Sequence, residues 1–359
     1  MDIQELVETG NYINEFKKEK VIFRKYPDKK LMIVKRKYGL DYSVDKPWLN
    51  YCRGLIIDYE HNKVVFIPPI KSKEILTKES FVEKIDEVYE LADGTMINLF
   101  YFNGSWLTST RSNIGCTNKW TQDIDFQQMF QECSQNLKYD TLNQEYTYSF
   151  VMRHKKNRIT SIIDTNELVL VEIRVSYIYI SGIVDCYLCK LDNDLDELPT
   201  NEGYRLLRKV EVTSNRETTV LQKGLTGYYE GQRYKWLTTE HKFIEMIKPN
   251  TNNPCLNYLV LRNSGHLTNY LKLFPEYRFH YDEYRKKVHS ITQLLHQYYI
   301  AVFVKKEVDK KDIPFALKPL IYELHGLYLK DKQAISWQIV KNYIYELEPK
   351  RLQFVFNHL

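Results

Sequence analysis

The stretch that decides the fold is VYELADGTMINLFYFNGSWLTSTRSNIG, residues 88–115. An Asn103-Gly104 pair separates two runs of β-forming residues, over 95–102 and 105–111. Asn-Gly between two such runs is typical of a two-residue hairpin turn, because both central residues must adopt positive φ to match the twist of the strands. The stretch therefore predicts a β-hairpin, with a further turn at Asp93-Gly94 just before it.

The length and composition of the chain indicate two domains. A chain of 359 residues with 43% hydrophobic residues can bury one large core or two ordinary ones. The sequence pattern changes from strand-forming to helix-forming near residue 246, so we expect one domain over 1–245 and a second over 246–359. The formal charge of +5 permits nucleic-acid binding without requiring it. A net positive charge favours non-specific binding of polyanions and says nothing about the fold.

Helical patterns are clearest after residue 246. Residues 276–306 contain neither Gly nor Pro, which predicts one long helix, and further helices are expected over 315–329, 336–347 and 350–357. In the β-rich part, the spacing of apolar residues over 126–133 predicts a helix packed on a sheet, and we also expect a short helix over 204–210.

The six cysteines give no sign of a metal site or a disulfide framework. No signal-peptide pattern precedes them, so reduced intracellular thiols are expected. Cys186 and Cys189 form one close pair, but no second pair or histidines follow at ligand spacing, and their odd offset in an apolar strand puts them on opposite faces. No apolar run is long enough to span a bilayer, so we expect a soluble protein with no membrane partner.

The four residues before the hairpin and the polar end of the hairpin carry a family resemblance. Leu91-Ala92-Asp93-Gly94 and the segment STRSN at 109–113 resemble motifs I and Ia of the covalent nucleotidyltransferases, which include RNA ligases, DNA ligases and mRNA capping enzymes. In that family Lys-x-Asp-Gly opens a strand, and the lysine takes the nucleotidyl group. Here Leu91 stands in the place of that lysine.

Four further motifs follow the order of the phage-type RNA ligases. Arg53-Gly54 resembles an Arg-Gly that precedes motif I, where the arginine approaches the phosphates of the nucleotide. The remaining resemblances are YSFV at 148–151 with Asn157-Arg158-Ile159 for motif III, Lys223-Gly224 for motif IV, and YKWL at 234–237 for motif V. Placing motif IV at Glu230-Gly231 is rejected, because those residues form the expected turn and leave no strand before Lys235.

The resemblance implies a fold class and a loss of catalysis. The implied fold is α+β: an antiparallel-sheet nucleotidyltransferase domain, of the ATP-grasp-like ligase kind, followed by an all-helical C-terminal domain. The family reaction requires a lysine amine that attacks the α-phosphate of ATP or GTP. Four family positions are changed here, and they are Leu91, Ser149, Lys223 and Leu237. A pseudoenzyme with no catalytic residue is the economical interpretation, although Lys73 or Lys84 remain open as substitute nucleophiles.

Binding could survive the loss of the nucleophile, because cationic walls and a base slot do not depend on it. The residues that the resemblance implies for nucleotide or RNA binding are Arg53, Asp93, Gly94, Arg111, Ser149, Phe150, Arg158, Lys235 and Trp236. No cofactor is firmly expected; ATP or GTP with Mg²⁺ is the candidate bound ligand, and no metal ligand is assigned. For each tryptophan, Trp106 included, core packing is the alternative to stacking.

Three functions remain open at this level. The first is an inactive RNA-ligase-like protein that binds an RNA end, a cap or a nucleotide, within a viral assembly that includes other viral proteins. The second is an active ATP-dependent RNA ligase with a divergent site, and the third is a scaffold subunit that binds no nucleotide. The tail, with YLKLFPEYRF at 270–279, IYELHGLYL at 321–329 and LEPKRLQFVFN at 347–357, resembles ligase-like proteins of large DNA viruses. That resemblance implies the cytoplasm of a host cell, a virus factory or the virion as the location.

Overall fold

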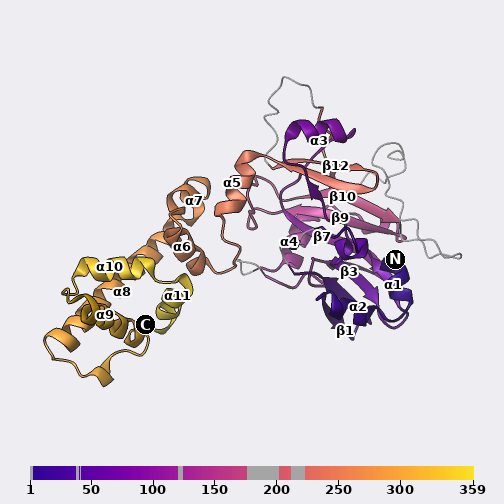
Figure 1. Ribbon diagram of the computed structural model, residues 1–359. Coiled ribbons are helices and arrows are strands. Elements are labelled where there is room, and N and C mark those ends of the chain that lie inside the picture. Colours follow the sequence, from indigo (N-terminus) through magenta and orange to yellow (C-terminus); the bar gives the residue numbers. More distant parts are fainter. Residues whose placement is uncertain (1–2, 38–39, 41, 120–123, 176–201, 212–222) are drawn as a thin grey trace. The chain divides into compact units, whose positions relative to one another are not determined.

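The computed structural model describes residues 3–37, 40, 42–119, 124–175, 202–211 and 223–359. The chain divides into two compact units, Met1–Lys242 and Phe243–Leu359 (Figure 1). The division falls three residues before the boundary expected between 245 and 246. Cys186 and Cys189 lie outside the described residues.

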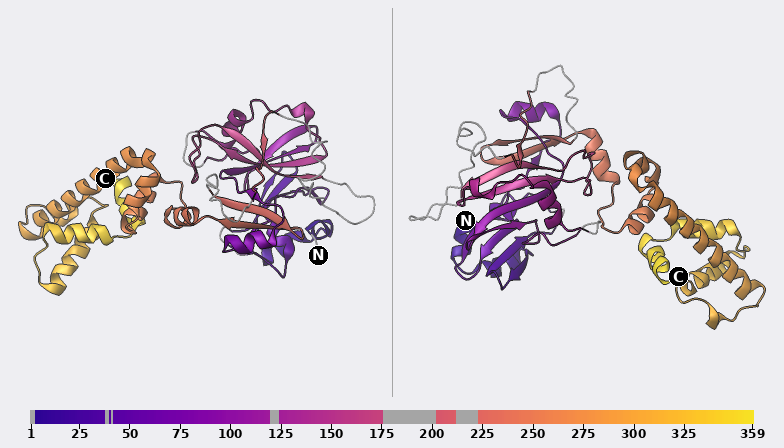
Figure 2. Two further views of the ribbon diagram at one scale, coloured as in Figure 1. Left: turned by 90° about the horizontal axis from the view of Figure 1, so that it is seen from above. Right: turned by 180° about the vertical axis from the view of Figure 1, so that it is seen from behind.

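Three sheets build the first unit, each of them largely antiparallel (Figure 2). The first has the order β1-β2-β3-β4, the second β11-β10-β9-β7-β8 and the third β5-β13-β12-β6. The strands are β1 (Ile22–Tyr26), β2 (Leu31–Lys35), β3 (Arg53–Asp58), β4 (Lys63–Phe66), β5 (Lys73–Glu74), β6 (Tyr89–Glu90), β7 (Thr95–Phe102), β8 (Ser105–Ser109), β9 (Tyr146–Arg153), β10 (Glu167–Val175), β11 (Arg205–Leu206), β12 (Gly224–Tyr229) and β13 (Gln232–Leu237).

The expected hairpin is confirmed as β7 and β8. Phe102 pairs with Ser105 across the turn, and the two turn residues, Asn103 and Gly104, have φ values of 48° and 81°. These positive values are the ones that a two-residue turn matched to strand twist requires. The turn between β12 and β13 has the same form, because Glu230 and Gly231 have φ values of 48° and 71°. Glu230-Gly231 is therefore a turn and not a strand entrance.

Helices of the first unit pack on the apolar faces of its sheets. They are α1 (Ile3–Glu8), α2 (Tyr12–Lys18), α3 (Lys78–Lys84) and α4 (Phe126–Cys133), with short 3-10 turns η1 (Pro47–Tyr51) and η2 (Tyr139–Thr141). The side chain of Asp125 accepts a hydrogen bond from the backbone N–H of Gln128 and so caps α4. The apolar face of α4 packs on the second sheet, around Phe130 and Phe150.

The other face of the second sheet packs on the third sheet. Val151, Val169 and Val171 form a small apolar cluster with Tyr89 of β6. Beside it, the hydroxyl of Tyr228 on β12 donates a hydrogen bond to the Glu172 carboxylate on β10. This contact joins the two sheets directly, because the two residues belong to different sheets.

The second unit is all-helical, as the fold class required. Its long helix α8 (Arg278–Tyr299) continues as a π-helix, η5 (Ile300–Val304). The other helices are α5 (Thr239–Ile247), which begins in the first unit, α6 (Pro254–Asn263), α7 (Leu267–Leu273), η4 (Pro275–Tyr277), η6 (Lys310–Asp312), α9 (Lys318–Asp331), α10 (Trp337–Glu346) and α11 (Pro349–His358). One apolar core joins them, with Leu295, Leu317 and Ile344 fully buried.

One expected helix is wrong. Residues 204–210 do not form a helix, because Arg205 and Leu206 pair with Val169 and Leu170 as strand β11 at the edge of the second sheet. No helix in the part of the chain that the structure describes is long and apolar enough to cross a bilayer.

Candidate nucleotide or RNA-end site

Six cationic side chains line one cavity of about 260 Å³ in the first unit, and three of them are residues expected from the sequence. They are Arg36, Lys37, Arg53, Lys71, Arg111 and Lys235, and the described lining is completed by Leu40, Leu49 and Asn50. No carboxylate is among these described lining residues. The first unit has 34 Lys and Arg against 35 Asp and Glu, so this grouping does not follow from a general excess of positive charge.

A glycine brings Arg53 and Arg111 together. Gly54 has a φ of +115°, and a Cβ at this position would lie 3.1 Å from the Cα of Arg111. Only glycine adopts that conformation without strain, and only glycine allows so close a backbone approach. The guanidinium of Arg111 then donates through Nη2 to the backbone carbonyl of Arg36, at 2.7 Å. The three arginines therefore come from strand ends and a loop that contact one another.

Two of the three lysines of the cavity have contacts in or near the third sheet: Lys235 lies on β13, and Lys71 lies two residues before β5. Lys235 pairs with Glu74 of β5, with 3.4 Å between Nζ and Oε2, and Lys242 pairs with the same carboxylate at 3.3 Å. Lys71 donates to the backbone carbonyl of Leu40. Among the described residues, these lysines and the lining arginines outnumber the one neighbouring carboxylate, Glu74, and such a grouping favours anions, above all phosphate groups.

Asp93 is a buried hydrogen-bond acceptor rather than an open ligand. Its Oδ2 accepts from the backbone N–H groups of Thr160 and Ser161 at 2.9 and 2.8 Å, and from the Thr160 hydroxyl at 2.6 Å. Lys223 Nζ lies 3.3 Å from Oδ1. Burial alone would raise the pKa of Asp93, but Lys223 and these donors outweigh it and lower the pKa to about 2. The aspartate therefore fixes the loop after β9 as a permanent anion.

Lys223 places an amine close to the motif I position. The backbone N–H of Leu91 donates to the carbonyl of Gly224 at 2.9 Å, so the Leu91 backbone adjoins the start of β12. Lys223 directly precedes Gly224, and its amine contacts Asp93, which lies two positions beyond Leu91. The two substitute lysines considered from the sequence are elsewhere: Lys73 lies over the ring of Tyr42, and Lys84 over the rings of Tyr229 and Tyr234.

Several expected binding residues are placed in the core or in structural contacts instead. Phe150 is fully buried beside Tyr148 and Tyr204, so it is not a surface on which a base could stack. Trp236 packs against the apolar cluster around Phe81. Neither ring is among the described residues that line the basic cavity.

Ser149, Gly94 and Arg158 also have structural contacts. The buried Ser149 hydroxyl donates to Asn98 Oδ1 at 3.2 Å, inside the second sheet. A Cβ on Gly94 would lie 2.4 Å from the carbonyl oxygen of Met152, so this glycine permits a close approach to β9. Arg158 donates through Nε to the carbonyl of Thr160 at 3.2 Å, in the loop that Asp93 holds. Of the nine expected residues, Arg53, Arg111 and Lys235 come together in the basic cavity.

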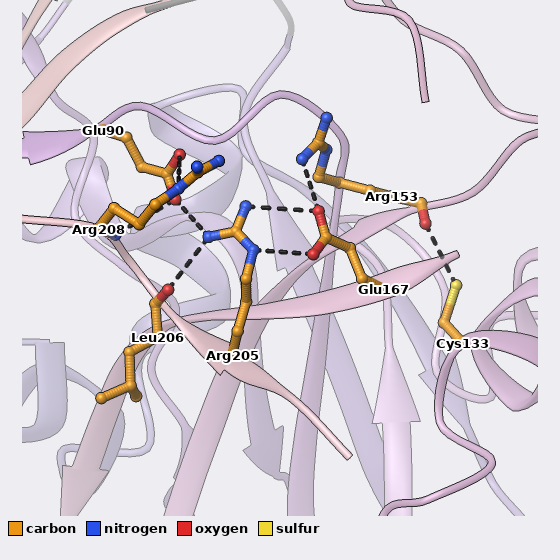
Figure 3. A network of polar contacts seen from close by, with 7 residues as sticks. All are labelled: Glu90, Cys133, Arg153, Glu167, Arg205, Leu206 and Arg208. Carbon is orange, nitrogen blue, oxygen red and sulfur yellow. Dashed lines mark hydrogen bonds and ion pairs between the residues drawn. The ribbon is translucent and has the colours of Figure 1, made fainter. Parts of the chain in front are cut away.

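A network of alternating arginine and glutamate side chains lies at the edge of the second sheet (Figure 3). The guanidinium of Arg205 lies between the carboxylates of Glu90 and Glu167, and Glu167 also pairs with Arg153. Arg208 adds a second cation to Glu90 at 3.2 Å. Because carboxylates pair with all three of these arginines, Arg153, Arg205 and Arg208 support the fold rather than an anion site.

The space between the second and third sheets contains charged side chains as well as the valine cluster. Glu172 accepts from both Tyr228 and Arg174, and Arg174 is itself buried. Burial and the neighbouring Glu172 raise the pKa of Tyr228 well above its ordinary value. A flat ring entering here would have to displace these contacts.

Sequence reasoning missed four residues around the site. Arg36 and Lys37 belong to a basic run at 35–37, and that run is the only signal for them. Lys71 follows Pro68-Pro69 without any motif. His241 is buried, and its Nδ1 lies 3.2 Å from the Thr160 hydroxyl. Nothing in the surrounding sequence TTEHKF marks this histidine.

Comparison with known proteins gives a ligase-like relationship. The chain is 26% identical over 190 residues to a bifunctional polynucleotide kinase/RNA ligase of Autographa californica nuclear polyhedrosis virus. The chain is related to the covalent nucleotidyltransferases. The match covers 46% of this ligase-like chain and about a quarter, 26%, of the viral protein's length.

Two further comparisons add little to that relationship. An ATP-dependent DNA ligase of Aquifex aeolicus superposes with a TM-score of 0.43 and 13% identity, over 89% of this chain and 80% of that one. This likeness is too loose to support any conclusion. No family model matches the chain.

Proposed function

We propose that this ligase-like protein binds the phosphate groups of an RNA end, a cap or a nucleotide in the basic cavity, without transferring a nucleotide, within a viral assembly. The observation that carries the proposal is the grouping of six cations around one cavity with no described carboxylate among its lining residues. Phosphate oxygens accept charge-assisted hydrogen bonds from such groups. The relationship to a viral kinase/RNA ligase supports RNA or a nucleotide as the ligand that carries the bound phosphate.

Loss of transfer rests on the residue at the motif I position. Leu91 has no group that could attack phosphorus, and Leu237, at the second motif V position, is buried and apolar. The inter-sheet space is occupied by Glu172, Tyr228 and the valine cluster. In this proposal the cations of the basic cavity bind phosphate, whereas the residue at the motif I position carries no amine of its own.

The test compares RNA oligonucleotides with and without a 5′-phosphate, by fluorescence anisotropy. The wild-type protein should bind the 5′-phosphorylated oligonucleotide more tightly, and Arg53→Ala/Arg111→Ala should bind it at least about tenfold more weakly. The salt slope of log K should become shallower by about 0.7 for each phosphate contact removed from a single strand. A cap dinucleotide and ATP serve as competitors to separate the three ligands.

The matched control is Lys63→Ala, which removes one cation from the exposed face of β4, away from the lining residues of the cavity. It should bind as the wild type does. Removing the 5′-phosphate should no longer matter in the Arg53→Ala/Arg111→Ala protein. Equal affinity of the wild type for both oligonucleotides, together with no binding of the cap or ATP, would refute the proposal.

A second function has one observation in its favour, the Lys223 amine beside Asp93 and next to the Leu91 backbone. An active ligase would use this amine for the attack on the α-phosphate. Incubation with labelled ATP or GTP and Mg²⁺, followed by denaturation, separates the two functions. A covalent label on the wild type that is absent from Lys223→Met would show an active ligase and overturn the binding proposal. We expect no label on either protein.

A further inference from the structure

A second cavity lies along β8, the edge strand of the second sheet. Its volume is about 550 Å³, and its walls include Trp106 and Thr108 of β8, Gln127 of α4, and Tyr139 of η2. None of these residues takes part in the basic cavity or in the Asp93 contacts. The cavity therefore has no role in the site described above.

One wall of this cavity is aromatic and held in place. The Trp106 ring lies 5.3 Å from that of Tyr101, 6.0 Å from that of Tyr148 and 6.5 Å from that of Tyr139, measured between centroids. Tyr139 keeps 38% of its surface exposed. Rings fixed by their neighbours lose little conformational entropy when a flat ligand stacks on them.

The other wall is polar and has a fixed orientation. The Thr108 hydroxyl donates to Gln127 Oε1 at 2.6 Å, and the Gln127 backbone N–H donates to the Cys116 carbonyl at 2.9 Å. With Oε1 engaged, the amide NH₂ of Gln127 is left as a hydrogen-bond donor, and no described residue accepts a hydrogen bond from it. An aromatic face beside a directed amide donor suits a flat heteroaromatic ring that carries acceptor atoms, as nucleobases do.

The loop after β8 borders both cavities. Arg111 lines the basic cavity and Gly115 lines the aromatic one, while the Gly115 N–H donates to the Thr108 carbonyl at 2.7 Å. The Cα atoms of Thr108 and Arg111 cannot be more than about 11 Å apart, because only three Cα–Cα steps of about 3.8 Å join them. A single-stranded RNA whose terminal phosphate occupies the basic cavity could therefore place a nearby base at the edge of β8.

The geometry points to a binding site for one unstacked nucleobase of a single-stranded RNA, formed by Trp106, Tyr139 and Gln127. This inference rests on the proposed function, and it specifies the ligand as a single-stranded end rather than a duplex or a free nucleotide. Base stacking on an aromatic ring tolerates any sequence, because every base has a π-face. Specificity for one base is therefore not expected from stacking itself.

The test uses Tyr139→Ala and Gln127→Leu with a 5′-phosphorylated single-stranded RNA. Tyr139→Ala should weaken binding by about five- to hundredfold, the range of one lost stacking contact, and leave the salt slope unchanged. An oligonucleotide with one abasic position near its 5′ end should lose the same factor with the wild type. That oligonucleotide should lose nothing further with Tyr139→Ala. Tyr229→Ala, which removes a ring that is 39% exposed on β12, is the matched control.

The outcomes separate this site from the basic cavity. Wild-type affinity in both Tyr139→Ala and Gln127→Leu, with affinity lost in Arg53→Ala/Arg111→Ala, would overturn the base site and leave the proposed function standing. Equal losses on intact and abasic RNA would also overturn it, because the tyrosine would then act only through the fold. No RNA binding by the wild type would overturn both.

Discussion

Replacing Asp93 by asparagine should destabilise the first unit in a pH-dependent way. The carboxylate accepts three hydrogen bonds from Thr160 and Ser161 and pairs with Lys223. Its pKa is about 2 in the folded protein against an ordinary value of 3.8. At about 1.4 kcal/mol for each pH unit of that difference, the ionised form contributes about 2 kcal/mol to the free energy of unfolding at pH 7.

The sign follows from the lowered pKa of the folded state. A carboxyl whose pKa is depressed by folding stabilises the protein fully above its unfolded pKa, near 4, and loses that contribution as pH falls through about 2. The difference between the wild type and Asp93→Asn should therefore be about 2 kcal/mol at pH 7. About 1 kcal/mol of this difference should be lost by pH 3.

Urea unfolding followed by tryptophan fluorescence measures this difference. Four of the five tryptophans belong to residues 1–242, so the signal reports mainly on the first unit. Asp164→Asn, which changes an exposed aspartate a few residues beyond the Asp93 contacts, is the control and should shift stability by no more than about 0.5 kcal/mol. A gap below about 0.5 kcal/mol at pH 7, or a gap that does not change between pH 5 and pH 3, would refute the reasoning.

Two glycine substitutions give further predictions. Gly54→Ala should weaken binding of 5′-phosphorylated RNA, measured by fluorescence anisotropy. The new Cβ would lie 3.1 Å from the Cα of Arg111 and would push Arg53 and Arg111 apart. Gly104→Ala is the control, because Gly104 also has a positive φ but has open space around its Cβ, and it should bind as the wild type does. Gly94→Ala should lower the free energy of unfolding by more than about 2 kcal/mol in urea titration, because its Cβ would lie 2.4 Å from a backbone oxygen of the central strand β9 that cannot move aside; a loss below about 0.5 kcal/mol would contradict this.

The features that the sequence predicted well are local ones. Asn103-Gly104 determines its own backbone conformation, so the hairpin could be read from two residues and their flanks. The long helix α8 follows from an uninterrupted run of helix-forming residues. Strand β11 was mistaken for a helix because its two residues are extended only through pairing with β10, which lies more than thirty residues earlier.

The candidate site was only partly predictable, for two physical reasons. Arg36 and Lys71 join the basic cavity through the contact of distant strands, which no single segment encodes. Phe150 could have been excluded earlier, because adjacent residues of a strand point to opposite faces of the sheet, so Ser149 and Phe150 cannot both line one groove. A family resemblance assigns positions in a motif, whereas alternation along the strand decides which of them can reach a ligand.

The Glu172–Tyr228 contact has a consequence for motion. A buried carboxylate deprived of its donors would cost several kcal/mol, so the second and third sheets should keep their spacing through a whole cycle of ligand binding and release. A protein braced in this way cannot use sheet opening to admit or expel a substrate. It would hold its ligand as a rigid receptor does, and bound and free forms of the first unit should superpose.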